Sequence, residues 1–132
     1  MSEATGPKGE LTMRVPAMPK DANAAGDVFG GWVMSQMDLA AGIRAAERAH
    51  GRVATVAVNS LVFRKPVKVG DTLCVYTEID RIGRSSITLT VEAFAERYLT
   101  REEVKVTEAV FVMVALDGTG APTPIPPAPP AG

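Results

Sequence analysis

One ionisable side chain, Asp38, interrupts a stretch that is otherwise uncharged between Asp27 and Arg44. Apolar residues of this stretch recur at three- and four-residue steps, which predicts a helix over about Gly30–His50. On that helix Asp38 lies on or beside the apolar stripe, where an unpaired carboxylate is costly. We therefore expect Asp38 to be partly desolvated, either as a general base toward water or as a hydrogen-bonded structural group or one at a subunit contact.

Two glycines, Gly30 and Gly31, stand where the expected helix begins. The first amides of a helix have no partner within it, and glycine lets a ligand come close to the backbone. Together with the helix dipole, such amides can stabilise an oxyanion that develops on a carbonyl group, although Gly-Gly is also common in tight turns. Asn23, seven residues before Gly30, either orients a water or a carbonyl group or shapes the loop.

Two short polar segments at the ends of predicted strands carry groups that can bind phosphates or the amide of a pantetheine. The candidates are Lys65, between Arg64 and Pro66, and the run Arg84, Ser85 and Ser86 after Gly83. The same residue types are common in solvated turns, so both interpretations stay open at this point.

The chain has a single histidine, His50, and a single cysteine, Cys74, among its 132 residues. One cysteine cannot form an internal disulfide, and one His with one Cys cannot build a structural zinc site of the usual kind. A nucleophilic triad would have to use His50, which we expect to be a helix-end residue, and Cys74 is expected to be inert. The net charge of −1 argues against a dedicated nucleic-acid binder. The chemistry therefore rests on carboxylates and the backbone.

The elements that position these residues form one domain. We expect a flexible N-terminus at 1–8, a core domain at 9–118 and a flexible tail at 119–132, which holds six of the ten prolines. A short strand and a loop precede the helix, and four strands follow it; the expected strands are Glu10–Val15, Val53–Phe63, Thr72–Arg81, Ser85–Tyr98 and Val104–Leu116. The simplest architecture is an antiparallel sheet wrapped around one helix, an α+β fold.

Alternation along the last predicted strand assigns one set of residues to the inner face, namely Val104, Val106, Val110, Val112, Val114 and Leu116. Glu108 interrupts this set and is a second candidate for a buried carboxylate.

The polar start of the chain lacks the apolar run of a signal peptide, and no stretch approaches the roughly 20 apolar residues of a membrane span. We therefore expect a cytoplasmic protein.

Several motifs resemble one known family. The run MPKDANAAGDVFGGWVMSQMD at Met18–Asp38, followed by AHGRVATVAV at Ala49–Val58, is similar to the hotdog-fold acyl-CoA thioesterases, most closely their YciA-like bacterial branch. Three later segments match in the same order: Phe63–Asp71, Gly83–Ile87 and Thr107–Phe111. The resemblance covers about Gly9–Gly118, nearly the whole expected core.

This resemblance implies a hotdog fold, in which a long central helix is wrapped by a five- to six-stranded antiparallel sheet. It implies a homo-oligomer: dimers that join their sheets and share active sites, commonly assembled as a trimer of dimers, a hexamer. It further implies hydrolysis of an acyl-CoA to a free acid and CoA, as in fatty acid metabolism, with no metal or organic cofactor, no nucleic acid and no membrane as a partner.

The family's functional positions fall on residues already singled out. Asp38 becomes the general base or nucleophile, Asn23 its loop partner, and Gly31, beside Gly30, the donor that polarises the thioester carbonyl. The CoA-binding positions fall on Lys65, Arg84, Ser85 and Ser86. The proline-rich tail departs from the family, whose members in this branch often end in a charged segment.

Two other functions compete with hydrolysis. A hotdog dehydratase or hydratase generally uses a catalytic histidine beside a carboxylate on the central helix, whereas His50 stands at the far end of the helix from Gly31. A non-catalytic acyl-CoA-binding hotdog module is the alternative outside the enzymes. The presence of both Asp38 and Asn23 favours hydrolysis over such a module.

Overall fold

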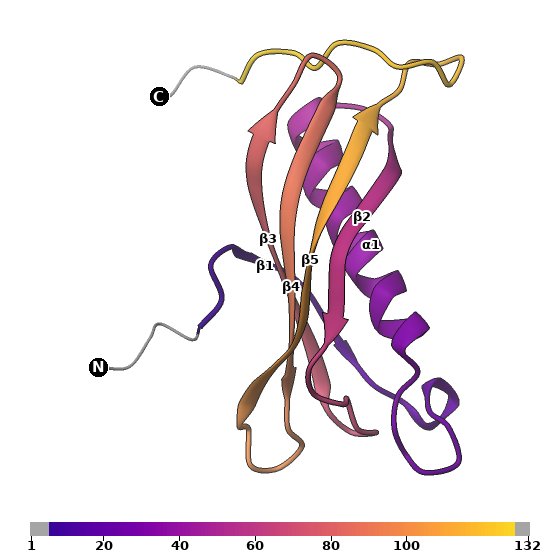
Figure 1. Cartoon of the computed structure of the whole chain (residues 1–132), viewed down its shortest axis with the longest axis vertical. Helices are drawn as coiled ribbons and strands as arrows, with labels where there is room; N and C mark the ends of the chain where they lie inside the picture. Colours follow the sequence, from indigo (N-terminus) through magenta and orange to yellow (C-terminus); the bar gives the residue numbers. More distant parts are fainter. Residues whose placement is uncertain (1–5, 129–132) are drawn as a thin grey trace.

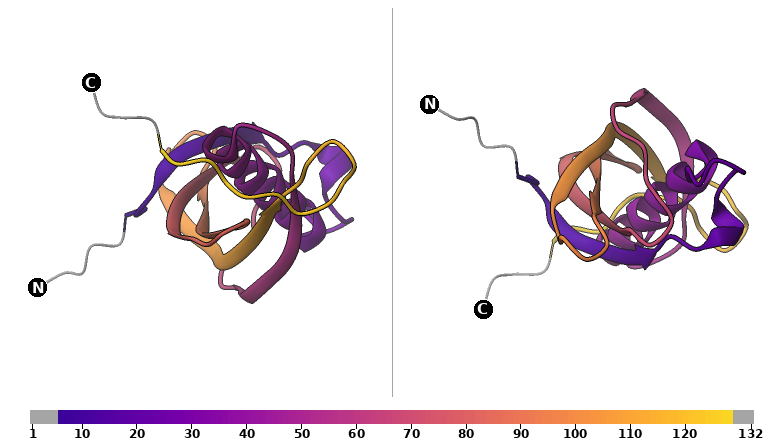
Figure 2. Two further views of the ribbon diagram at one scale, coloured as in Figure 1. Left: turned by 90° about the horizontal axis from the view of Figure 1, so that it is seen from above. Right: turned by 90° about the horizontal axis from the view of Figure 1, so that it is seen from below.

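A five-stranded antiparallel sheet curls around one long helix in the computed structural model, which describes residues 6–128 (Figure 1). The elements in chain order are β1 (Glu10–Pro16), the short 3₁₀ turn η1 (Pro19–Asp21), α1 (Gly30–Ala49), β2 (Val53–Phe63), β3 (Thr72–Ile82), β4 (Ser86–Glu96) and β5 (Glu103–Ala115). The strand order is β1-β3-β4-β5-β2. Views along the long axis show the sheet enclosing α1 on one side (Figure 2). The predicted α+β hotdog architecture is confirmed, with five strands.

The helix α1 packs against the sheet through small residues. Its buried side chains are Val33, Met37, Ala40, Ala41, Ala45 and Ala49. Four alanines in this set let the strands approach the helix closely, and the 20 residues extend about 30 Å. The helix ends at His50, whose left-handed φ of 55° turns the chain out of the helix.

The inner face of the sheet follows the predicted alternation on β3 and β4. Leu73, Val75 and Thr77 are buried on β3, and a second run is buried on β4, namely Ile87, Leu89, Val91 and Ala93. Together with the apolar stripe of α1 these side chains form the core.

On β5 the predicted inner face is wrong beyond Val106. The buried residues are Val106, Thr107, Ala109, Phe111, Met113 and Ala115, whereas Val110, Val112 and Val114 are half-buried on the outer face. The cause is a β-bulge: Ala93 pairs with Thr107, but the next residue, Phe94, pairs with Lys105, so one residue of β5 is extra. An extra residue reverses the in-out alternation for the rest of the strand.

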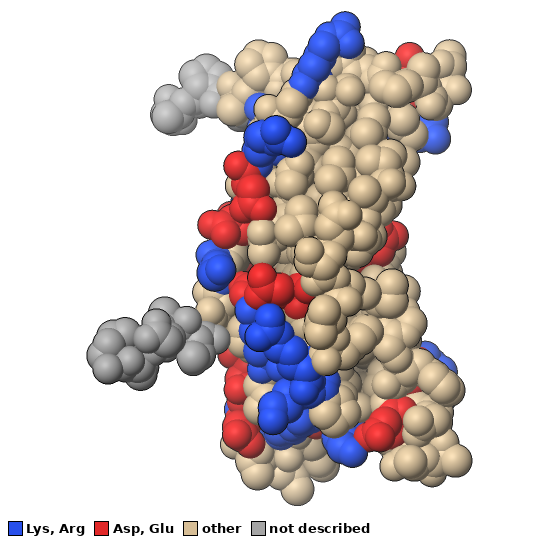
Figure 3. Space-filling view, in the orientation of Figure 1, with Lys and Arg blue, Asp and Glu red and all other residues tan. Residues whose placement is uncertain are grey.

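The strand β2 forms one edge of the sheet, so one side of it has no neighbouring strand among residues 6–128. It has 11 residues, none of them charged, and it exposes Val56 (59%) and Val62 (63%) to solvent. Figure 3 shows a broad band nearly free of charged side chains on this part of the surface. Within the described part of the chain, no helix is long and apolar enough to cross a membrane.

Some residues of the two segments expected to be flexible are hydrogen-bonded to the domain. Residues 1–5 and 129–132 lie outside the described residues. Next to them, the Lys8 amide donates to Glu92 Oε1 at 2.8 Å, and Thr123 and Ile125 donate backbone hydrogen bonds to the body of the domain.

Candidate active site

Asp38 projects from the middle of α1 into a groove of about 590 Å³ beside β2. Thr55, on β2, donates a hydrogen bond from its hydroxyl to Asp38 Oδ1, and the same hydroxyl lies 3.3 Å from the Met113 sulfur. Leu39 and Ile43 line the groove and are exposed. In the single chain Asp38 is exposed as well, which corrects the expected partial desolvation: the buried stripe passes through Met37, and the next residue points away from it.

Thr55 was not predicted as a functional residue. It lies in a strand of apolar and β-branched residues, where threonine is ordinary. Its closeness to Asp38 depends on how α1 packs on the sheet, because 17 residues and a reversal of direction separate the two. No local spacing pattern in the sequence carries that information.

The start of α1 presents free backbone donors. The amides of Trp32 and Val33 donate to the Phe29 carbonyl at 3.1 and 3.3 Å, and within residues 6–128 the amides of Gly30 and Gly31 have no acceptor. A Cβ at Gly31 would meet no atom within 4 Å, so the space beside this residue is open. Seven residues of helix place the Gly31 amide about 10 Å along the axis from Asp38.

A pocket of about 400 Å³ opens at the same helix end and brings Gly30 together with Lys65. Its walls are mainly apolar, with Val28, Val33 and Phe63 among them. A Cβ at Gly30 would lie 3.2 Å from the Phe63 ring, so the absence of a side chain lets the helix start approach the end of β2 without a shift of that ring. Two of the predicted site residues therefore share one pocket, with an ammonium group at its rim.

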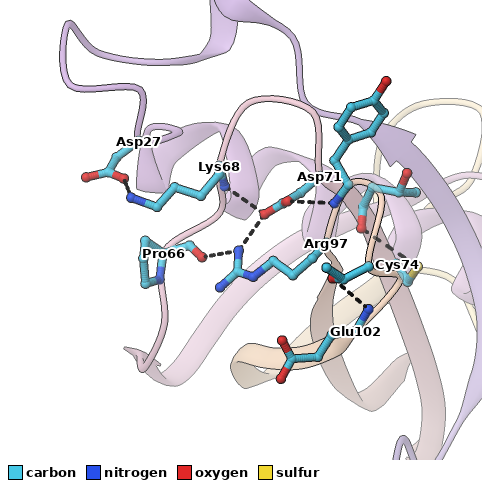
Figure 4. A network of polar contacts seen from close by, with 10 residues as sticks. Asp27, Pro66, Lys68, Asp71, Cys74, Arg97 and Glu102 are labelled. Carbon is cyan, nitrogen blue, oxygen red and sulfur yellow. Dashed lines mark hydrogen bonds and ion pairs between the residues drawn. The ribbon is translucent and has the colours of Figure 1, made fainter.

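The loop that carries Lys65 is fixed by the carboxylate of Asp71, which is 2% exposed (Figure 4). That carboxylate accepts hydrogen bonds from the Lys68 amide at 2.9 Å and from the Arg97 guanidinium, and the guanidinium also donates to the Pro66 carbonyl at 3.1 Å. The Lys68 ammonium forms an ion pair with Asp27, on the loop before α1. These contacts join the basic loop to the start of the helix.

Asn23 shapes the loop before α1. Its side-chain oxygen accepts hydrogen bonds from the amides of Ala25 (2.9 Å) and Asp27 (3.2 Å), and its carbonyl accepts one from Gly26, whose φ is 87°. This is the turn-forming alternative considered for Asn23. A catalytic contribution of this residue remains a prediction.

Arg84, Ser85 and Ser86 lie apart from the other site residues. Arg84 and Ser85 occupy the turn between β3 and β4, and Ser86 begins β4, at the opposite end of the sheet from the start of α1 and from the segment that follows β2 (Figure 1). A single chain therefore does not bring this turn next to Gly30 and Lys65.

The expectation of a buried carboxylate at Glu108 is wrong, and the bulge on β5 explains why. Glu108 faces outward with its side chain 34% exposed, and a hydrogen bond from Lys105 lowers the pKa of its carboxyl group. The carboxylate buried on this face of the sheet is Glu92, which accepts from the Lys105 ammonium at 2.9 Å. Both carboxylates lie on the face of the sheet away from the helix, so they take no part in the groove at Asp38.

The remaining candidates contribute no further reactive group. Cys74 is buried, and this burial raises the pKa of its thiol. Within residues 6–128, no cluster of three or more His, Cys, Asp or Glu side chains is arranged to hold a metal ion. His50 lies at the end of α1 remote from Gly30.

Comparison with known proteins decides the family. The model of the thioesterase superfamily matches residues 25–100. The chain belongs to this superfamily. The acyl-CoA thioester hydrolase YciA of Salmonella typhimurium is 46% identical over 123 residues, covering 91% of this chain and 92% of the relative. An uncharacterised acyl-CoA thioester hydrolase of Haemophilus influenzae is 50% identical over 122 residues, covering 90% and 79%.

Solved structures agree with this placement. The hexameric broad-specificity acyl-coenzyme A thioesterase HI0827 superimposes with a TM-score of 0.88 at 49% identity, covering 92% of this thioesterase and 84% of that chain. The hexameric thioesterase y2039 from Yersinia pestis gives a TM-score of 0.89 at 47% identity, covering 92% and 99%. The predicted fold, family and enzyme class of this thioesterase are confirmed, and within the superfamily it is an acyl-CoA thioester hydrolase.

Proposed function

We propose that this thioesterase hydrolyses acyl-CoA with Asp38 as general base. The observation that carries the proposal is the pair Asp38–Thr55 in an open groove. The unpaired amides of Gly30 and Gly31, about 10 Å along the same helix, would serve the site of a second chain. The groove takes the thioester, and the carboxylate accepts a proton from the attacking water.

The proposed reaction balances with one water molecule. The water oxygen attacks the thioester carbon while Asp38 of one chain takes the proton. The Gly31 amide of the same chain lies about 10 Å away, so the Gly31 amide of a second chain donates to the oxyanion that forms. Collapse of this intermediate breaks the carbon–sulfur bond, and the thiolate of CoA takes the proton back from Asp38. Thr55 holds the carboxylate in position through its hydrogen bond, and Asn23 keeps the loop before the helix in shape.

Variants studied in relatives support this choice of residues. An acyl-CoA hydrolase from Staphylococcus aureus, solved with butyryl-CoA and CoA, has a TM-score of 0.79 at 28% identity, covering 91% of this chain and 73% of that chain. Alanine variants of one aspartate and one threonine of that hydrolase were solved, and these positions are 17 residues apart, as are Asp38 and Thr55. An aspartate-to-alanine variant of HI0827 was solved as well.

We also propose how two chains complete the site. Antiparallel pairing of two β2 edges about a twofold axis would join the sheets and pair the backbone groups that each edge leaves free. Because the two chains then run in opposite directions, the β3–β4 turn of one chain lies at the same end as the start of α1 in the other. Arg84, Ser85 and Ser86 of one chain would then join Lys65 of its partner around the phosphates of CoA, and three such dimers would form the hexamer.

The test is a panel of acyl-CoA substrates with detection of the released thiol. Hydrolysis releases one free CoA for each acid formed, and the chain length with the highest kcat/KM defines the preference. Binding of acyl-CoA without release of thiol would contradict hydrolysis and identify the chain as a binding module. Release of a hydrated or dehydrated acyl-CoA with its thioester intact would instead identify a hydratase or dehydratase.

An isotope experiment tests for a nucleophilic role of Asp38. In ¹⁸O-labelled water under single-turnover conditions, a general base leaves the Asp38 carboxylate unlabelled, and the label enters only the product acid. Label in the Asp38 carboxylate would show a covalent anhydride and contradict the proposed role.

A further inference from the structure

The segment after β5 crosses the end of the sheet where α1 stops and β3 turns into β4 (Figures 1 and 2). The chain first reverses at Asp117–Gly120, where the Asp117 carboxylate accepts hydrogen bonds from the amides of Thr119 (2.8 Å) and Ala121 (3.1 Å). The Thr119 hydroxyl donates to the same carboxylate and contributes most to lowering the pKa of Asp117, and the two amide hydrogen bonds lower it further. We call the following residues, Ala121–Pro126, the strap.

The strap is hydrogen-bonded to three different parts of the domain. The Thr123 amide donates to the Ala115 carbonyl at the end of β5 (2.9 Å), and the Ile125 amide donates to the Arg84 carbonyl in the β3–β4 turn (2.8 Å). The Arg48 guanidinium, in the last turn of α1, donates to the Pro126 carbonyl at 2.7 Å. The side chain of Ile125 packs against the core.

The order of prolines fits these bonds. Prolines at 122, 124 and 126 alternate with Thr123 and Ile125, so the residues that keep an N–H are the two that donate to the domain. Successive N–H groups of an extended chain point to opposite sides, so the prolines occupy positions that need no donor. Proline also restricts the free chain and reduces the entropy lost on docking. The composition that predicted a flexible end therefore equally suits a docked strap.

The turn that the strap holds contains three of the predicted CoA-binding residues. Its backbone is fixed from the other side by bonds from the Ala115 amide to the Ser85 carbonyl and from the Gly83 amide to the Ser86 carbonyl, both 2.8 Å. The Arg84 side chain is exposed, and it has no carboxylate partner within residues 6–128. A guanidinium that is free of carboxylates on a fixed turn is available to a phosphate.

We propose that the strap is a positioning element for CoA: it holds the Arg84–Ser86 turn in the conformation that binds the phosphates of the nucleotide. This inference rests on the proposed function. A turn that is already held in the binding conformation loses less conformational entropy when CoA binds. The strap then affects substrates that carry the nucleotide and leaves the chemistry at Asp38 unchanged.

The test uses Ile125→Pro, which removes the N–H that donates to Arg84, with Ile125→Val as the matched control that keeps it. Each variant is assayed with an acyl-CoA and with the corresponding acyl-pantetheine, which lacks the nucleotide. We expect I125P to raise KM for the acyl-CoA about tenfold, the loss of one good hydrogen bond to a phosphate. Its kcat, its KM for the acyl-pantetheine and both constants of I125V should stay within about twofold of wild type.

Coupling to Arg84 gives a second readout. Arg84→Ala should raise KM for acyl-CoA to a similar extent, and I125P added to R84A should raise it no further, since both changes remove one interaction. A full additive effect in the double variant would contradict the proposal.

Other outcomes overturn the inference separately from the proposed function. An equal rise in KM for both substrates would show that the strap only stabilises the fold, and no rise for either would show that it has no role in binding. If I125P does not fold, Arg48→Met provides a second variant, because it removes the hydrogen bond from α1 to the strap. We expect R48M to raise KM roughly threefold for the acyl-CoA and not for the acyl-pantetheine. An unchanged KM for the acyl-CoA would reject the proposal. Absence of hydrolysis of both substrates by the wild type would instead reject the proposed function.

Discussion

The two edges of the sheet differ in length, charge and exposed apolar surface. The edge strand β1 has seven residues and contains Glu10, Arg14 and Pro16, whereas β2 has 11 residues and no charge. Charged side chains and proline protect an edge from pairing with another chain, because both oppose the addition of a strand. The contrast supports the proposal that β2 pairs with the β2 strand of a second chain, whereas β1 remains an unpaired edge.

The candidate reactive groups lie beside β2 and not beside β1. Asp38 and Thr55 lie in the groove between α1 and β2, and Gly30 packs against Phe63, the last residue of β2. No predicted site residue lies on β1. The edge suited to pairing is therefore also the edge that borders the proposed active site, so assembly and hydrolysis should fail together.

The largest effect is expected when a charge is placed on β2. Val62→Glu would place a carboxylate on the pairing edge, beside its cross-strand neighbour Glu108, and charge on an edge strand opposes the addition of another strand. We expect the proposed hexamer to dissociate and hydrolysis to fall roughly 100-fold, because the proposed site loses its second chain. Light scattering on a sizing column measures the first effect, and thiol release measures the second.

The matched control is Leu11→Glu, which places the same charge at an exposed apolar residue of β1. That variant should remain assembled and active. A stable, active hexamer of V62E, or dissociation by L11E, would contradict the proposed difference between the two edges.

A smaller effect is expected inside the groove. Thr55→Val keeps the shape of the side chain and removes the hydroxyl that bonds to Asp38, so kcat should fall about tenfold with assembly unchanged. Thr90→Val is the control, since the Thr90 hydroxyl donates to Asp80 (2.6 Å) on strands away from β2. Equal kcat values for T55V and wild type would remove Thr55 from the mechanism.

The smallest effect concerns the contact between the helix start and β2. Gly30→Ala would press a methyl group against the Phe63 ring at 3.2 Å, and we expect it to lower the free energy of unfolding by about 1 kcal/mol in urea titrations. Gly31→Ala faces open space and should change stability by less than about 0.5 kcal/mol. It should nevertheless slow hydrolysis, because the added methyl stands beside the proposed oxyanion donor. A more stable G30A would show that the two elements do not pack as described.

The sequence predicts those parts of the fold that depend on local alternation. On β3 and β4 the inner residues are the predicted ones, because neither strand carries an extra residue within its buried part and their mutual pairing shifts only between Ile79 and Arg81. On β5 the prediction fails after Val106, because the bulge arises from pairing with β4 and has no signal within β5 itself. The error at Glu108 follows from the same residue shift.

The site is predictable only as far as motifs extend. Asp38, Gly30 and Gly31 belong to a continuous motif, and the structure places them together on α1. Thr55 was missed because only the packing of α1 on β2 brings it to Asp38. The exposure of Asp38 in one chain has a related origin: the periodicity of a helix shows which side chains avoid water, but it does not distinguish a core from a surface that a second chain covers.

The strap shows the limit of composition. A run rich in proline cannot form a helix or a central strand, which favours a flexible end. Its docking depends on the alternation of Pro124 and Pro126 with Ile125, and on acceptors such as the Arg84 carbonyl that are far away in the sequence.

The central claim, that Asp38 performs the hydrolysis, is tested most directly by the kcat of Asp38→Asn on its best acyl-CoA substrate. Glu47→Gln, at an exposed carboxylate of the same helix, is the matched control. We predict a folded hexamer whose kcat is lower by roughly 10²–10⁴-fold, with the control at the wild-type value. A kcat of D38N within a few-fold of wild type would contradict the account.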